Sequence, residues 1–98
     1  MEIKIKSIHF DATDKLEAFI EKKVTKLEKF NDSILQSEVT LKVTKPETAK
    51  NKQASISVKL RNGDCFAEKV CNTFEEAVDT AVEALEKQLL KMKEKSRG

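Results

Sequence analysis

The chain has 98 residues, of which 37% are charged, but its formal net charge is only +2. A chain of this length supports one domain with its own hydrophobic core, so we expect a single domain over residues 1–98. Because the charges nearly balance, an overall excess of positive charge cannot attract a polyanion. Any such attraction must come from positive charge that is concentrated in one part of the surface. The sequence has five Phe and no Trp or Tyr, which equips it poorly for stacking bases on an aromatic platform.

Targeting, membrane, metal and catalytic motifs are missing from the sequence. The segment from Met1 onward has no apolar core of the signal-peptide type and no stretch of membrane-spanning length, so we expect a cytoplasmic protein without a membrane partner. Cys65 and Cys71 would lie about 20 Å apart along one predicted strand, beyond disulfide reach. With His9 as the single histidine, we expect no metal or cofactor, no small-molecule substrate and no enzymatic activity.

The first two predicted elements are a strand and a helix. Apolar and charged residues alternate over Glu2–Ser7, which predicts a half-buried strand. Apolar residues then recur at helical spacing until about Phe30, which predicts an amphipathic helix. Thr13 or Asp14 can cap this helix, and Glu17 is placed to complete a capping box with Asp14.

Three further strands are predicted from alternation. They cover Glu38–Lys45, Ala54–Arg61 and Asp64–Asn72. Asn62-Gly63, between the last two, predicts a hairpin with a type I′ turn, because both central residues of that turn need positive φ. The last strand has two possible buried faces, so its register stays open. One face would carry Cys65, Ala67 and Cys71, and the other Phe66 and Val70.

The last predicted helix is long and its charge reverses along its length. Thr73-Phe-Glu-Glu76 is a capping box that opens it. Acidic residues come first, and Lys87, Lys91 and Lys95 then recur every four residues as one positive stripe. A straight row of ammonium groups suits an RNA backbone. Acids in the first turn and bases in the last also complement the helix dipole, so both interpretations stay open.

The order of these elements predicts the fold class. The order β-α-β-β-β-α indicates an α+β domain, with a four-stranded mixed sheet and two helices packed on one face. The first two strands, joined through a helix, should be parallel, and the others should form a meander. The architecture resembles that of double-stranded-RNA-binding domains.

The first predicted helix also carries a basic face, in addition to the positive stripe on the last helix. Lys23 lies at the border of this face. Its members follow helical steps and are Lys15, Lys22, Lys26 and Lys29. If the two helices pack side by side, their outer surfaces present two parallel lysine rows. A pair of rows can grip a folded RNA backbone where one row cannot.

Several blocks of sequence resemble one known family over essentially the whole chain. They are Lys26-Leu-Glu-Lys-Phe30, Leu41-Lys-Val43, Ala77-Val-Asp79 and, most specific, Leu85-Glu-Lys-Gln-Leu89 with the lysines that follow. Together they resemble the ribosome hibernation promoting factor family, also called the ribosome-associated inhibitor or sigma-54 modulation family. The resemblance implies a bacterial, non-catalytic protein that occupies the messenger and transfer RNA channel of the small ribosomal subunit. Such a protein inhibits translation and preserves idle ribosomes in stationary phase or starvation.

The resemblance also implies contacts with ribosomal RNA by lysines of both helices. They are Lys23, Lys26, Lys29, Lys87, Lys91, Lys93 and Lys95, with Arg97 as a further candidate. Ala84 departs from the Lys that members often carry, so one phosphate contact is expected to be missing. The protein is expected to be a monomer off the ribosome and to lack the extra domain with which long members pair ribosomes.

Two alternative functions stay open at this point. One is a protein-binding regulator of the sigma-54 modulation type, which would use the exposed face of the sheet. The other is a module that binds structured RNA outside the ribosome. Salt dependence separates the RNA-binding readings from the protein-binding one, because neutralising several phosphates gives binding that weakens steeply as salt increases.

Overall fold

The structure, a computed structural model, describes residues 2–8, 10–45, 50–61 and 63–97, with side chains as far as Met92. Its element order is the predicted β-α-β-β-β-α, which confirms the α+β class. The elements are β1 (Glu2–Ile8), α1 (Asp14–Thr25), a single 3₁₀ turn (Lys26–Lys29), β2 (Ile34–Val43), β3 (Lys52–Leu60), β4 (Gly63–Cys71) and α2 (Phe74–Arg97).

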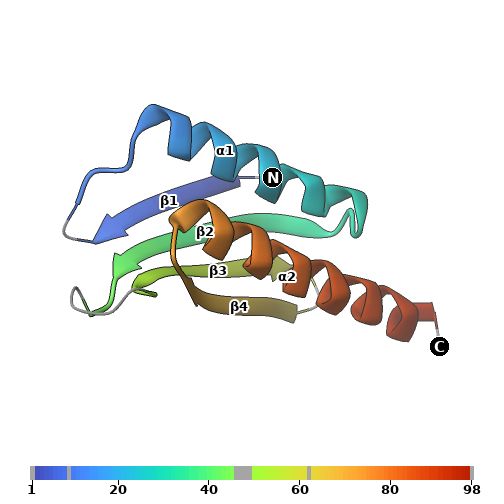
Figure 1. Cartoon of the computed structure of the whole chain (residues 1–98). Helices are drawn as coiled ribbons and strands as arrows, with labels where there is room; N and C mark the ends of the chain where they lie inside the picture. The colour runs from blue at the N-terminus through green and yellow to red at the C-terminus, as the bar shows by residue number, and fades with distance from the viewer. Residues whose placement is uncertain (1, 9, 46–49, 62, 98) are drawn as a thin grey trace.

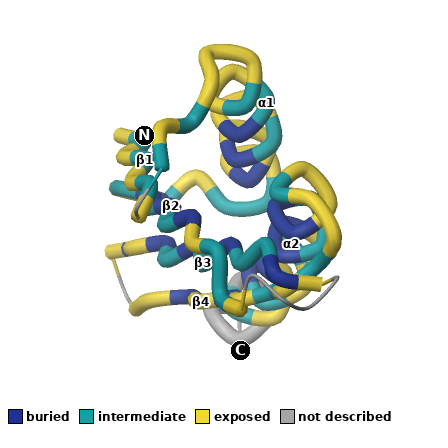
Figure 2. The backbone as a smooth tube through the Cα atoms, turned by 60° about the vertical axis from the view of Figure 1, so that its left-hand side comes forward, coloured by how far each residue is buried: buried dark blue, intermediate teal, exposed yellow. Residues whose placement is uncertain are grey.

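The four strands form one sheet in the order β1-β2-β3-β4. β1 pairs with β2 in parallel and the other two pairs are antiparallel, as predicted. Both helices cover the same face of the sheet and run side by side in the same direction (Figure 1). α1 lies nearer β1, and α2 lies over β3 and β4. No helix of the described chain covers the other face, which we call the open face (Figure 2).

The hydrophobic core lies between the sheet and the two helices (Figure 2). Alternate residues of β3 point into it, and Ile56 and Val58 are completely buried. The helices add completely buried side chains at Ile20, Val24, Ala77, Val78, Ala81, Leu85 and Leu89. These residues follow helical spacing, which confirms the apolar stripes predicted for both helices.

The open question of the β4 register is settled by its pairing with β3. Ala67 lies opposite Ile56, and Cys65 lies opposite Val58, so the small residues of β4 face the helices. Phe66 and Val70 project from the open face and are 55% and 43% exposed. Small side chains suit the inner face because α2 packs directly on this strand.

The N-terminal caps of both helices are threonines that the sequence offered, Thr73 for α2 and, of the two alternatives, Thr13 for α1. Thr73 caps α2, since its hydroxyl accepts a hydrogen bond of 3.1 Å from the Glu76 amide. In α1 the cap is Thr13, whose hydroxyl accepts from the Leu16 amide at 3.1 Å. The predicted capping box from Asp14 is therefore wrong, because Asp14 is already the first helical residue.

The end of α1 differs from a continuous α-helix to Phe30. The chain tightens into the 3₁₀ turn Lys26–Lys29, and the Phe30 amide donates to the Leu27 carbonyl at 3.0 Å. The turn keeps Leu27 completely buried while the chain leaves the helix for β2. Tightened last turns of this kind satisfy carbonyl groups that an α-helix end leaves without partners.

Two strand boundaries differ from the predicted ones because the pairing is irregular. β2 begins at Ile34 rather than Glu38, with a bulge between Ile34 and Gln36 that breaks the alternation. The predicted hairpin joins β3 and β4, but Gly63 is already the first residue of β4, paired with Leu60, and has φ +156°. Asn62, the other residue of the predicted type I′ turn, lies outside the described residues.

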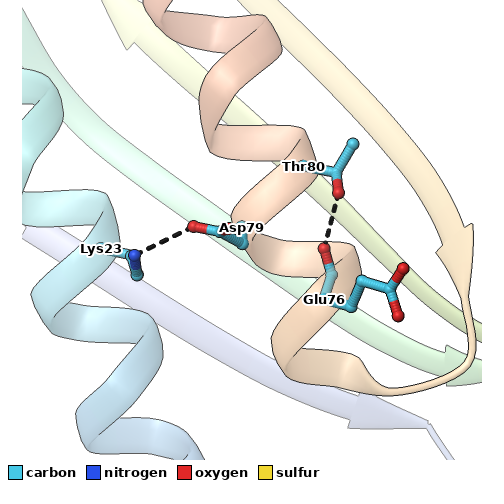
Figure 3. A network of polar contacts seen from close by, with 4 residues as sticks. All are labelled: Lys23, Glu76, Asp79 and Thr80. Atoms are coloured by element: carbon cyan, nitrogen blue, oxygen red, sulfur yellow. Dashed lines mark hydrogen bonds and ion pairs between the residues drawn. The ribbon is translucent and has the colours of Figure 1, made fainter.

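The two helices are joined by an ion pair. Lys23 on α1 places its Nζ 2.9 Å from Oδ1 of Asp79 on α2 (Figure 3). The same Nζ lies 5.6 Å from the centroid of the Phe19 ring, a cation–π distance. At the start of α2, the rings of Phe10 and Phe74 stack with centroids 4.8 Å apart. These contacts fix the position of α2 relative to α1 and to the connector that precedes α1.

We predict a measurable coupling between Lys23 and Asp79 in the stability of the fold. In a double-mutant cycle of K23M and D79A, the coupling energy should be about 0.5 kcal/mol, because the pair is only partly shielded from water. High salt should reduce it. The measurement is urea unfolding of the four proteins.

The Lys6–Glu38 pair on the open face is the matched control. It is longer, at 3.5 Å, and its two side chains are 67% and 40% exposed. The corresponding cycle with K6M and E38A should give a smaller coupling. Equal couplings at the two sites would contradict a specific role for the pair between the helices.

A sulfur contact joins α2 to β4. The Cys65 thiol donates to the Met92 thioether at 3.2 Å. Met92 also packs over the start of β4, where its Cε would lie 3.2 Å from a Cβ placed on Gly63. Burial, with a smaller contribution from the Asp64 carboxylate, raises the pKa of the Cys65 thiol above its ordinary value of 9.0.

This shift predicts a loss of stability in alkaline solution. Below pH 9.0 the thiol is protonated in the folded and unfolded chains alike, so it contributes no pH dependence. Above that pH the unfolded chain ionises first, since the pKa of Cys65 is higher in the folded state, and the free energy of unfolding falls. Urea unfolding of wild type and C65A across this range should show a steeper decline for wild type. Parallel declines would contradict the assignment.

Candidate nucleic-acid interface

The structure places the seven lysines of the predicted RNA-binding set in different surroundings. Lys26, Lys29, Lys87 and Lys91 are exposed. Lys23 is half-buried and engaged with Asp79. Lys93 and Lys95 belong to α2, but their side chains lie outside the described part of the chain.

The lysine row of α1 is straightened by the 3₁₀ turn at its end. Residues three apart eclipse one another in a 3₁₀ helix, so Lys26 and Lys29 stand one above the other. Lys22 and Lys15 continue the row toward the start of α1, and all four are exposed. Lys23 lies about 60° from Lys26 around the helix, on the side of the core and of α2. The row therefore follows the seam between the two helices.

Two polar contacts on opposite sides of α2 define its flanks. Asp79 faces α1 through Lys23, whereas Gln88 faces β4 through the backbone of Phe66. Gln88 lies nine positions after Asp79. At about 100° per residue this is two and a half turns, so the two side chains leave the helix in directions about 180° apart. We call these sides the α1 flank and the β4 flank.

The acidic and basic residues of α2 are separated around the helix as well as along it. Within about 60° of Asp79, on the α1 flank, lie Glu75, Glu76, Glu83 and Glu86. Lys87 projects between the two flanks, and Lys91 lies about 60° from Gln88, on the β4 flank. Lys91 is thereby turned about 120° from Asp79, whereas Lys87 lies one turn after Glu83 and about 80° from Asp79.

This arrangement adds an acidic surface to the predicted pair of parallel lysine rows. The helices do pack side by side, but the acidic α1 flank of α2 lies between the two rows. It faces the lysine row of α1, and the Lys23–Asp79 ion pair is the contact between them. The acids of α2 therefore balance part of the positive charge of the α1 row. Lys87 and Lys91 are exposed and lie farther from α1 than these acids do.

Other candidate residues lie around these rows. Ala84 is half-buried against the core, about 40° from Gln88 on the β4 flank, where a Lys would have extended the α2 row. Lys59 is exposed on the open face of the sheet, and Arg61 is exposed just beyond the end of β3. His9 lies outside the described residues.

Gln88 is a residue whose role the sequence pattern did not predict. Its side-chain amide nitrogen donates to the Phe66 carbonyl at 2.9 Å, and its oxygen accepts from the Phe66 amide at 3.3 Å. The only signal in the sequence was its place inside the Leu85-Glu-Lys-Gln-Leu89 block. Nothing in the helical pattern indicates that this side chain reaches a strand.

The described residues contain neither a metal-type cluster nor a membrane-type helix. Across the described ranges, no three side chains of His, Cys, Asp or Glu come together as a metal ion would require. In the same residues, no helix combines the length and the apolar character of a membrane crossing.

Comparison with known proteins places the whole chain in one family. A family profile described as "Sigma 54 modulation protein / S30EA ribosomal protein" matches residues 3–97. The crystal structure of the N-terminal domain of Thermus thermophilus Protein Y superposes with a TM-score of 0.81 at 29% identity, covering 94% of this chain and 99% of that one.

A second solved structure, a ribosomal subunit interface protein from Coxiella burnetii, gives a TM-score of 0.83 at 25% identity, covering 95% of this chain and 98% of that one. No curated protein matches the sequence significantly. On the profile match and the shared fold, the chain belongs to the Sigma 54 modulation protein / S30EA ribosomal protein family, as its sequence motifs predicted.

Proposed function

We propose that the protein binds the small ribosomal subunit and occupies the channel of messenger and transfer RNA. The observation that carries the proposal is the row of exposed lysines on α2, in which Lys87 and Lys91 lie about 80° and 120° around the helix from Asp79. Family membership supports it, as does the similarity to a ribosomal subunit interface protein. The binding is non-catalytic: it blocks translation and preserves idle ribosomes in stationary phase or starvation.

The proposal assigns different shares to the lysines. Lys87 and Lys91, with Lys95 following at the same spacing, form the main row against the RNA backbone. Lys26 and Lys29 form the second contact, and Lys93, about 200° from Lys91 around the helix, is a separate contact. Lys23 has the smallest share in RNA contact, because its ammonium group is engaged with Asp79.

The chemistry of lysine predicts recognition by shape. An ammonium group binds phosphate as a point charge and does not distinguish bases, so these contacts position the protein without reading a sequence. Folded RNA displays its phosphates at fixed spacings, which a rigid helix can match. The acids on the α1 flank repel phosphate and so restrict the approach of RNA to the lysine side of α2. The protein would act in the cytoplasm and be a monomer off the ribosome.

One observation favours the alternative of a protein partner. Phe66 and Val70 expose apolar surface on the open face of β4, on either side of Glu68, and Ile8 on β1 is 37% exposed. A protein that binds the open face would bury these side chains, and the salt dependence would be shallow. The experiment below separates this alternative from the RNA-binding proposal.

The test removes the α2 row and compares it with an equal charge change elsewhere. The variant K87A/K91A/K95A should lose co-sedimentation with small ribosomal subunits, because three phosphate contacts are removed. If residual binding is measurable, the slope of log affinity against log salt concentration should decrease in magnitude by about 2 to 3. Its thermal unfolding should stay close to that of wild type, since Lys87 and Lys91 are exposed.

The matched control is K4A/K42A/K59A, which removes the same charge from the open face. It should retain co-sedimentation and the salt slope of wild type. Binding that survives in the α2 variant, or fails in the open-face variant alone, would overturn the proposal in favour of a contact through the sheet. A large loss of stability in the α2 variant would instead indicate that the lysines serve the helix dipole.

A further inference from the structure

Gln88 makes two hydrogen bonds to one residue of an edge strand. Its amide nitrogen donates to the carbonyl of Phe66 at 2.9 Å, and its amide oxygen accepts from the N–H of Phe66 at 3.3 Å. The pairing fixes the orientation of the side-chain amide, because nitrogen can only donate and oxygen can only accept. The amide thus binds Phe66 as a residue of a neighbouring strand would.

The position of Phe66 explains why a partner is needed there. β4 is the last strand in the sheet and pairs with β3 on one side only. In an antiparallel ladder, alternate residues direct their N–H and C=O groups away from the neighbouring strand. Phe66 is such a residue, and Gln88 satisfies both of its groups. Edge groups of this kind otherwise bond to water or to another chain.

Gln88 also holds the segment of α2 that carries the lysines. It lies one residue after Lys87 and three before Lys91. Beyond Leu89, the inward contact of α2 that the structure describes is Met92, which is only partly buried. Packing of the apolar stripe sets the overall roll of α2 on the sheet, and two hydrogen bonds to a backbone restrict the rotation that remains near Lys87 and Lys91, because hydrogen bonds depend on angle. At about 100° per residue, the roll determines where Lys87 and Lys91 point.

We propose that Gln88 is a positioning residue for RNA binding, which acts by fixing the roll of α2 on β4 and so the direction of Lys87 and Lys91. This inference rests on the proposed function, since it assigns those lysines to phosphate contact. Gln88 acts through Phe66, which takes one N–H donor and one oxygen lone pair of its amide. The role explains why a neutral amide stands within the basic segment of the helix.

The test is a double-mutant cycle of Q88L and K91A in small-subunit binding. Leucine keeps the volume and the charge of Gln88 but makes neither hydrogen bond. Q88L should weaken binding about tenfold and lower the salt slope by about one, as expected for one misplaced phosphate contact. In the K91A background, Q88L should have a much smaller effect, because the lysine through which it acts is gone. Binding is measured well below the unfolding temperature of each variant.

Two further measurements separate positioning from general stability. S55A removes two hydrogen bonds on the open face, one from the Ser55 hydroxyl to Glu68 at 3.0 Å and one from the Gln53 amide to the Ser55 hydroxyl at 3.4 Å, and should leave binding and salt slope unchanged. Amide hydrogen exchange of free protein should show Phe66 protected in wild type and S55A but not in Q88L.

Each of the other possible results contradicts either the positioning role of Gln88 or the proposed function. Equal effects of Q88L with and without Lys91 would show that Gln88 does not act through that lysine. Unchanged binding by Q88L, or an unprotected Phe66 amide in wild type, would overturn the positioning role alone. Failure of wild type to co-sediment with small subunits would overturn the proposed function, and the positioning role with it.

Discussion

The seating of α2 on β3 and β4 is the constraint on which the rest of the molecule depends. One sheet is covered by helices on a single face, so α2 must supply a large part of the core with one side and leave the other side to solvent. Ala77 and Ala81 let the first half of the helix approach the sheet closely, and Leu85 and Leu89 fill the space in the second half. Every exposed residue of α2 has its direction set by this contact.

The same contact sorts the charges of the helix. Residues beside the core stripe must face either α1 or the outer edge of β4. The acids lie toward α1, where Asp79 meets Lys23, and an uncharged amide lies toward β4. The lysines take the remaining arc. The separation of these charges around the helix follows from the sequence and the helical repeat, and it is the neighbouring elements that give each arc a separate use.

Much of the fold could be predicted because it depends on local patterns. The capping threonine Thr73, the alternation in β3 and the parallel pairing of β1 with β2 all follow from short segments or from connectivity. The bulge near Gln36 and the choice of Thr13 over Asp14 could not, since both depend on how neighbouring chain segments meet. The β4 register was ambiguous for the same reason: Cys65 and Phe66 are both apolar, and only the presence of α2 selects the smaller one.

The candidate site was predictable to a similar degree. The lysine spacing on α2 came from the sequence alone, and the exposure of Lys87 and Lys91 agrees with it. The engagement of Lys23 with Asp79, and of Gln88 with Phe66, joins residues far apart in the chain, and no periodicity encodes such pairs. The sequence therefore located the basic surface but not the contacts that orient it.

The parallel course of the two helices has a consequence for the molecule as a whole. Each helix begins with acids and ends with bases: α1 has Asp14 in its first turn and Lys22 and Lys23 in its last, while α2 passes from Glu75 and Glu76 to its lysines. Because the helices point the same way, the side-chain charge gradients of both run in the same direction through a chain of net charge +2. In the field of a polyanion, such a molecule experiences a torque that turns its basic end forward before any contact is made. Orientation during diffusion then raises the fraction of encounters that are productive, without the non-specific adhesion that accompanies a high net charge.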